Sequence, residues 1–146
     1  MRVVADTGPL VAATNRRDRG HALAAALVTE LGRELLIPEP VLVEVDQLLR
    51  ARVGTSAARS FLSALARGEH SVAFLSAGLL RRAVEIDAGF AALDLGLADA
   101  SVMALAERHS LPILTFDFED FRTTRPARGF WRLVVDEARY LDAAER

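Results

Sequence analysis

The sequence contains no cysteine, few histidines and no long uncharged apolar run. The absence of cysteine excludes disulfides, thiolate metal sites, iron–sulfur clusters and cysteine nucleophiles. His21, His70 and His109 lie far apart in the chain, which argues against a zinc site built from histidines. No stretch approaches the roughly 18 apolar residues needed to span a bilayer, and the N-terminus lacks the apolar core of a signal peptide. We therefore expect a cytoplasmic protein that does not enter a membrane.

Lysine is absent as well, because all 18 basic residues are arginine. A P-loop nucleotide site needs its phosphate-binding lysine, and a Schiff-base enzyme needs a side-chain amine. Enzymes that form a phosphoryl-aspartate normally use a lysine to neutralise the phosphate. The composition therefore disfavours all three classes, whatever the cause of the bias toward arginine.

The length of 146 residues and the hydrophobic share of 51% predict a single domain, residues 1–146, with a buried core. The net charge of −2 is not that of a basic nucleic-acid-binding domain. Arginines nevertheless gather in three groups, each of which is either a solvated surface or a phosphate-binding patch. The groups are Arg16, Arg17 and Arg19; Arg50, Arg52 and Arg59; and Arg122, Arg125, Arg128 and Arg132. Net charge alone neither supports nor rejects a polyanionic substrate.

Short apolar runs alternate with segments of helical periodicity along the whole chain. Strands are predicted at residues 3–5, 35–37, 72–75, 112–115 and 131–135. Helices are predicted at residues 10–15, 21–31, 41–53, from 55 to about 65, 79–93, 98–109 and 137–146. This alternation predicts an α/β fold around a mostly parallel sheet.

Two aspartates follow predicted strands, and two further carboxylates interrupt apolar helix faces. Asp6 and Asp117 follow the first and fourth strands, so both belong to the carboxyl edge of a parallel sheet, where ligands bind. Glu44 lies between Val41 and Leu48 on one apolar stripe, and Asp99 is followed by apolar residues at helical spacing. Taken singly, Asp99 fits a helix-capping residue and Glu44 fits a side chain that reaches water along a half-buried face.

Together these four carboxylates favour a metal site. Like charges about 4 Å apart repel by about 4 kcal/mol at an effective dielectric of 20, so a cleft holding all four either takes up protons or binds a cation. Oxygen ligands without cysteine or histidine favour a hard ion, Mg²⁺ or Mn²⁺. The chemistry natural to such a site is hydrolysis of a phosphodiester by activated water.

Four segments that contain these carboxylates resemble those of PIN-domain proteins and, within that superfamily, the VapC toxins of type II toxin–antitoxin systems. They occur in the family's order and cover most of the chain. The segments are Val3 to Thr7, Pro40 to Val45, Gly96 to Ser101 with Ala104, and Ile113 to Phe121. The last two are the more specific.

The resemblance implies a PIN-like three-layer α/β/α sandwich that carries a metal-dependent endoribonuclease site. Asp6, Glu44, Asp99 and Asp117 match the four acidic positions, with Thr7 and Thr115 as the polar residues beside them. On this basis Asp6, Asp99 and Asp117 are the expected ligands of Mg²⁺ or Mn²⁺, and Glu44 holds a water or a second ion. Asp46, Asp94, Glu119 and Asp120 match no site position. Residues 136–146 extend beyond a typical ending of the family.

The resemblance also implies three partners: an RNA substrate, a cognate VapB-like antitoxin and a second copy of the chain in a homodimer. The helices at residues 23–31 and 61–65 carry more apolar positions than one core-facing stripe needs, which is typical of a protein interface. Two alternatives remain open at this point. One is a PIN-like module that binds RNA or protein without cutting, and the other is a PIN nuclease that acts on DNA.

Overall fold

The computed structural model describes residues 1–146, and its elements alternate between short strands and helices. The strands are β1 (Val3–Ala5), β2 (Leu35–Pro38), β3 (Ser71–Ala73) and β4 (Ile113–Leu114). The helices are α1 (Thr7–Thr14), α2 (His21–Leu31), α3 (Glu39–Arg52), α4 (Thr55–Ala66), α5 (Ala77–Gly89), α6 (Gly96–His109), α7 (Phe118–Thr123) and α8 (Glu137–Ala144). Short 3₁₀ turns occupy Gly32–Glu34 and Ala91–Leu93.

The four strands form one parallel sheet in the order β3-β2-β1-β4. Val4 is in register with Leu36 on one side and Ile113 on the other. Strands β1, β2 and β4 are buried throughout, as expected for a parallel sheet that is covered on both faces. Because all strands run the same way, the ends of the adjacent strands β1 and β4 meet at one edge of the sheet.

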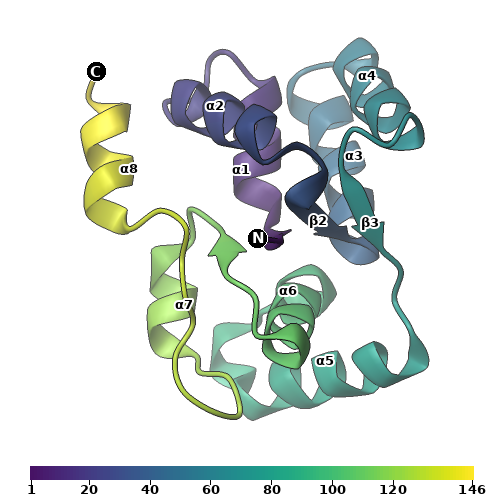
Figure 1. Ribbon diagram of the computed structural model, residues 1–146, viewed down its shortest axis with the longest axis vertical. Helices are drawn as coiled ribbons and strands as arrows, with labels where there is room; N and C mark the ends of the chain where they lie inside the picture. Colours follow the sequence, from purple (N-terminus) through teal and green to yellow (C-terminus); the bar gives the residue numbers. More distant parts are fainter.

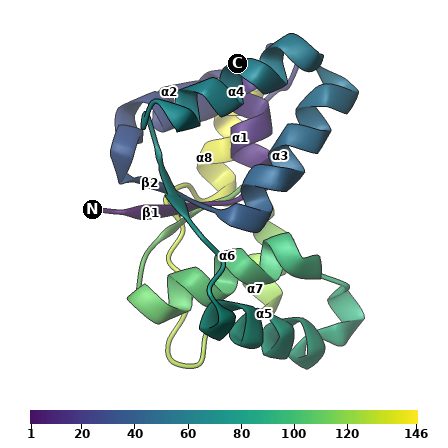
Figure 2. The same ribbon diagram turned by 90° about the vertical axis from the view of Figure 1, so that its right-hand side faces the viewer.

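Helices cover both faces of this sheet (Figure 1). Figure 2 shows α1, α2, α3 and α4 on one side of the strands and α5 and α6 on the other. This arrangement confirms the predicted three-layer α/β/α sandwich.

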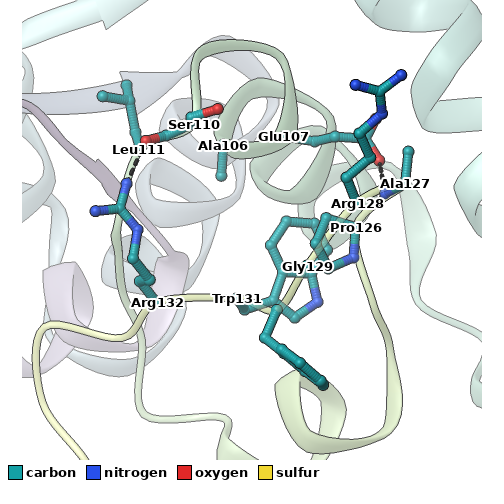
Figure 3. A pocket seen from close by; sticks show the side chains of 11 residues that line it. Ala106, Glu107, Ser110, Leu111, Pro126, Ala127, Arg128, Gly129, Trp131 and Arg132 are labelled. Carbon is teal, nitrogen blue, oxygen red and sulfur yellow. Dashed lines mark hydrogen bonds between the residues drawn. The ribbon is translucent and has the colours of Figure 1, made fainter.

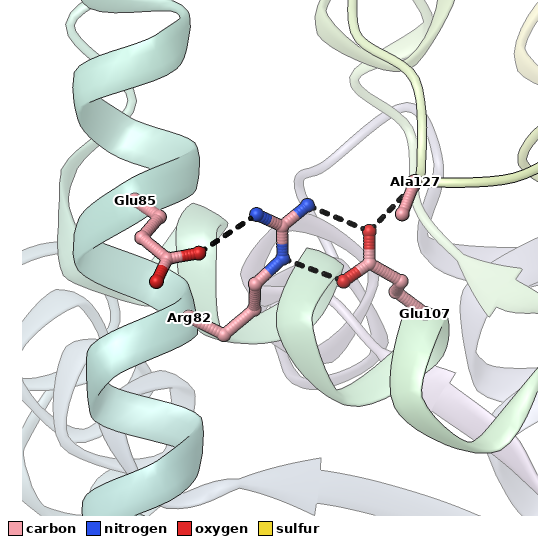
Figure 4. A network of polar contacts seen from close by, with 4 residues as sticks. All are labelled: Arg82, Glu85, Glu107 and Ala127. Atoms are coloured by element: carbon pink, nitrogen blue, oxygen red, sulfur yellow. Dashed lines mark hydrogen bonds and ion pairs between the residues drawn. The ribbon is translucent and has the colours of Figure 1, made fainter.

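Helix α6 is the most deeply buried helix, since the seven residues from Ala100 to Ala106 are all buried. It packs against α5, α3, β1 and β2. Arg82 of α5 fixes it further by donating two hydrogen bonds to Glu107, which also accepts from the backbone N–H of Ala127 (Figure 4). Packing along its length and these bonds near its end therefore fix α6 relative to the sheet, and Asp99 lies in the first turn of this helix.

Two sequence-based predictions of elements are corrected, and one helix was missed. The predicted strand at 131–135 is wrong: the segment makes a single bridge, between Leu133 and Ile113, because β4 is only two residues long. The helix predicted at 79–93 is wrong at its end, because it stops at Gly89 and a separate 3₁₀ turn follows. Helix α7 was not predicted, although Asp117 caps it by accepting from the Asp120 N–H at 3.2 Å.

No helix of the protein combines the length and the apolar character that a bilayer crossing requires.

Candidate active site

Asp6 is the most buried of the four carboxylates, at 5% exposure. It ends β1 and caps α1, because its Oδ1 accepts from the Thr7 N–H at 2.8 Å. Its other oxygen, Oδ2, accepts from the hydroxyl of Thr115 at 2.7 Å. Both oxygens of Asp6 are therefore held in place by residues at the carboxyl edge of the sheet.

Asp117 follows β4 by three residues and begins α7. Its backbone N–H donates to Thr115 Oγ1 at 3.0 Å, so the hydroxyl that binds Asp6 also positions the backbone of Asp117. The carboxylate itself is exposed and caps α7. One threonine thus connects the two strand-end aspartates.

Helices supply the other two carboxylates. Glu44 lies in the middle of α3 and Asp99 in the first turn of α6, and both side chains are half-buried. Since α3 packs on α6, the two face the same opening. One pocket of about 470 Å³ contains all four predicted residues. It is lined by Asp6, Thr7, Gly8, Glu44, Leu48, Asp99, Phe116 and Asp117.

The electrostatics of this pocket follow from the crowding of like charges. Burial, together with the negative charges of Asp6, Glu44 and Asp117, raises the pKa of Asp99 to about 7. The pKa of Asp6 is also raised by burial, against the lowering effect of its bonds from Thr115 and Thr7. No basic side chain lines the pocket to offset this charge.

Asp99 does not cap its helix. Asp99 is the fourth residue of α6, and the N-terminus of α6 has no side-chain capping bond. A negative charge in the first turn is favoured by the helix dipole by about 0.3–1 kcal/mol, which is small beside the burial and repulsion that raise its pKa. The capping explanation considered for this residue is therefore not supported.

The residues present fit a hard divalent cation. The donors at the pocket are all oxygen, and the hydroxyl of Thr7, which lines it, is buried without a hydrogen-bond partner. No three acidic or histidine side chains lie close enough together to hold a metal ion by themselves. Mg²⁺ keeps several waters and uses few direct carboxylates, so waters would complete its coordination at this pocket.

Asp120 is an acidic residue outside the four predicted positions. It is half-buried in α7 beside Asp117, and burial together with Asp117 raises its pKa to about 6. The signal in the sequence was its position three residues after Asp117, one helical turn along. It enlarges the acidic cluster but does not line the pocket.

A second pocket, of about 440 Å³, lies at the other end of α6 (Figure 3). It is lined by residues from Ala106 to Leu111 and from Pro126 to Arg132. Glu107 is eight residues beyond Asp99, about 12 Å along the helix. None of the four predicted carboxylates borders it, so it is separate from the candidate site.

The arginine groups take different positions. The guanidinium of Arg19 lies over the Tyr140 ring, 5.5 Å from its centroid, and Arg122 pairs with Glu137. Arg50 pairs with Asp46 along α3. Arg128 and Arg132 line the pocket at the far end of α6, and no member of any group borders the carboxylate pocket.

Comparison with known proteins places this fold and its sequence in one family. The model of the PIN domain matches residues 3–125. Ribonuclease VapC26 of Mycobacterium tuberculosis is 30% identical over 128 residues, which cover 87% of this chain and 95% of that protein.

Three solved structures share the fold. Mycobacterium tuberculosis VapC20, a Sarcin–Ricin loop cleaving toxin, has a TM-score of 0.76 at 22% identity, over 90% of this chain and 98% of its own. VapBC2 from Rickettsia felis, bound to a DNA fragment from its promoter, has a TM-score of 0.66 at 16% identity, over 91% and 97%. A toxin–antitoxin complex from Klebsiella pneumoniae has a TM-score of 0.62 at 19% identity, over 90% and 99%. The chain belongs to the PIN-domain family and, within it, to the VapC proteins.

Proposed function

We propose that this protein is a metal-dependent endoribonuclease and the toxin of a toxin–antitoxin pair. The observation that carries the proposal is the pocket in which Asp6, Glu44, Asp99 and Asp117 come together from four separate parts of the chain without a basic neighbour. Such a concentration of charge costs folding energy unless a cation binds. The name of the relative Ribonuclease VapC26 supports RNA as the substrate.

Each carboxylate has a distinct part in the proposed reaction. Asp6, Asp99 and Asp117 would supply oxygens to the ion, directly or through water, and Glu44 would hold a ligand water or a second ion. When bound, Mg²⁺ or Mn²⁺ makes water a better nucleophile and screens the charge that develops on the phosphate. Thr115 and the Thr7 N–H orient Asp6 by donating hydrogen bonds to its two oxygens, and these bonds oppose the rise in its pKa that burial causes.

The proposed antitoxin contact is a groove between α1, α2 and α4. It has a volume of about 270 Å³ and is lined mainly by apolar side chains, among them Leu10, Val28 and Phe61. Helices α2 and α4 are the ones whose surplus apolar positions predict an interface. An amphipathic helix laid along such a groove is a common mode of recognition, and the fold neighbours from Rickettsia felis and Klebsiella pneumoniae include antitoxin complexes.

A homodimer is proposed on a different surface. Leu80 and Val84 are 42% and 58% exposed and lie one turn apart on α5. Adjacent exposed apolar side chains on a small protein are typical of an interface. With RNA and an antitoxin as partners, the proposed site of action is the cytoplasm.

The test is an assay on purified wild-type protein and its Asp6→Asn variant, with single-stranded RNA and DNA oligonucleotides of the same sequence. We expect RNA cleavage with Mg²⁺ or Mn²⁺, none in chelator and none with Asp6→Asn. Cleavage of DNA alone would favour the DNA nuclease alternative. RNA binding without cleavage under all metal conditions would favour the binding module.

In cells, expression of the chain alone should arrest growth, and Asp6→Ala should remove the arrest. Co-expression of a short neighbouring gene should rescue growth, and its product should co-purify with the chain. A wild-type chain that is harmless and never co-purifies with that product would contradict the toxin assignment.

A further inference from the structure

A second hollow opens directly beside the carboxylate pocket. We call it the side groove. It has a volume of about 510 Å³ and is lined by Phe116, Asp117, Phe118, Glu119, Arg122 and Glu137. Phe116 and Asp117 border both the side groove and the carboxylate pocket, so the two hollows are neighbours on the surface. A polymer bound at the pocket therefore has a path into the side groove.

The side groove contains one cation, and that cation is already paired. Arg122 of α7 contacts Glu137 of α8 through Nη2 and Oε2 at 3.0 Å. The other charged residues of the lining, Asp117 and Glu119, are acidic. A phosphodiester chain that follows this path has only Arg122 to neutralise it, and Glu137 occupies that side chain in the free protein.

Helix α8 holds Glu137 at this position. Figure 1 shows α8, in yellow, beside α2 and at the end of a long segment that follows α7. Tyr140, one turn after Glu137, packs on Phe116 and Phe118 with ring centroids 4.5 and 5.7 Å away. Residues three apart share a helix face, so the packing of Tyr140 places Glu137 over the side groove.

The loop between α1 and α2 secures Tyr140 from the other side. The guanidinium of Arg19 lies 5.5 Å from the centre of the Tyr140 ring, and its Nε donates to the hydroxyl at 3.3 Å. At Gly20 a Cβ atom would lie 3.0 Å from Tyr140 and 3.1 Å from Phe116, so the backbone approaches these rings as closely as glycine allows. These contacts of Tyr140 therefore hold α8 against the segment that leads to Asp117.

From this arrangement we propose that Arg122 binds a phosphate of the RNA strand next to the cleaved bond, and that Glu137 is the carboxylate which this phosphate displaces. The inference rests on the proposed function and adds a regulated subsite to it. The Arg122 and Glu137 side chains are 63% and 46% exposed. An exposed pair of this kind changes an equilibrium by about two- to fivefold, so RNA displaces Glu137 at little cost and Glu137 weakens binding by the same factor.

The experiment measures binding of a fluorescently labelled, random-sequence single-stranded RNA of twelve nucleotides by anisotropy, at several salt concentrations and in chelator. The variants are Glu137→Gln, Arg122→Gln and the double variant. Asp142→Asn is the matched control, because it removes the same charge and an ion pair, with Arg146, from the same helix away from the side groove.

We expect Glu137→Gln to bind two- to fivefold more tightly and Asp142→Asn to bind like wild type. Arg122→Gln should bind more weakly and reduce the salt slope by about 0.7, the value for one contact with a single strand. In the Arg122→Gln background, Glu137→Gln should have no further effect. Equal gains from Glu137→Gln and Asp142→Asn, or a gain that persists without Arg122, would overturn the proposal.

Chelator prevents metal-dependent cleavage, so this result is independent of the proposed function. The expected binding pattern in a protein that never cleaves RNA would support the side groove and contradict the nuclease. Cleavage by wild type together with unchanged binding by Glu137→Gln would support the nuclease and overturn the side groove.

Discussion

The hydroxyl of Thr115 donates a hydrogen bond to Oδ2 of Asp6, 109 residues away in the sequence, with 2.7 Å between the two oxygens. The same hydroxyl accepts from the backbone N–H of Asp117 at 3.0 Å. Thr115 has no exposed surface, so no water can take over either bond. This one side chain therefore sets the relative position of the two strand-end aspartates, and it lowers the pKa of Asp6 against the effect of burial.

Replacing Thr115 with valine should damage both stability and metal binding. Thr115→Val leaves the Asp117 N–H without its acceptor and removes a donor from Asp6, a loss of about 1–3 kcal/mol of unfolding free energy. The pKa of Asp6 should rise further, which makes it a poorer metal ligand at neutral pH. Thr115→Ser keeps the hydroxyl and serves as the control. Urea unfolding and Mn²⁺ titration measure the two effects. Equal losses in both variants would show that the hydroxyl alone does not preserve the site, and would contradict this role of Thr115.

Asp99→Asn should stabilise the metal-free protein, in contrast to most substitutions at a buried site. The pKa of Asp99 is about 7 in the folded protein and 3.8 as its ordinary value, so the folded state holds a proton that the unfolded state has released. The proton on Asp99 stabilises the folded state fully below about pH 4, and this contribution to the unfolding free energy is lost as the pH rises through 7. The variant removes that loss, so its gain should grow from pH 5 to pH 8. The full shift in pKa corresponds to about 4 kcal/mol, and solvent screening of this half-buried side chain reduces the expected gain to about 2 kcal/mol.

Thermal unfolding in chelator at pH 5 and pH 8 tests this expectation. Glu30→Gln, which neutralises an exposed carboxylate on α2, is the control and should change little at either pH. A clear loss of stability in Asp99→Asn at pH 8 would show that its carboxylate contributes a favourable interaction to the fold. With Mg²⁺ present, the order of wild type and variant should reverse.

Metal binding should depend on pH through the same group. Mn²⁺ must displace the proton of Asp99, so its affinity should increase as pH rises from 6 to 8 and each binding event should release protons. Calorimetric titration in two buffers of different ionisation enthalpy measures that release. Asp6→Asn and Asp99→Asn should each abolish binding. Undiminished binding in both would show that these carboxylates hold no metal.

Blocking the groove between α1, α2 and α4 should prevent antitoxin binding without affecting cleavage. Ser60 of α4 is exposed and lines the groove, so Ser60→Arg fills it without disturbing the core. Ser63 is also exposed on α4 but does not line the groove, which makes Ser63→Arg the matched control. Co-purification with the neighbouring gene product should fail only for Ser60→Arg. Failure of both, or of neither, would place the antitoxin elsewhere.

Much of the sheet and the position of the site could be predicted from sequence. Runs such as Val3–Ala5 and Leu35–Ile37 are apolar throughout, the pattern of a strand buried on both faces, and each is followed by a helix. That order defines the carboxyl edge of the sheet, so the strand pattern alone is enough to bring Asp6 and Asp117 together. Asp99 and Glu44 could be predicted as candidate site residues because each is a carboxylate on an otherwise apolar face of its helix.

The interactions that depend on distant residues could not be predicted. The strand expected at 131–135 has the right composition but only two residues of β4 to pair with. Asp120 reads as an ordinary residue of a short charged helix, and only its burial and its closeness to Asp117 alter its pKa. Tyr140 of α8 packs on Phe116, which lies in a different segment of the chain. The hydrophobic pattern within each segment does not reveal this contact, so the sequence does not predict that α8 borders the site.

The rate of RNA cleavage by wild type and Asp99→Asn across a Mn²⁺ titration tests the central claim most directly. Wild type should be inactive in chelator and gain activity as Mn²⁺ saturates the protein. Asp99→Asn should keep its fold, be more stable than wild type without metal, and lose at least a hundredfold in rate, about 2.7 kcal/mol of transition-state stabilisation. A variant that cleaves RNA at the wild-type rate, or wild-type cleavage that persists in chelator, would contradict the four-carboxylate metal site.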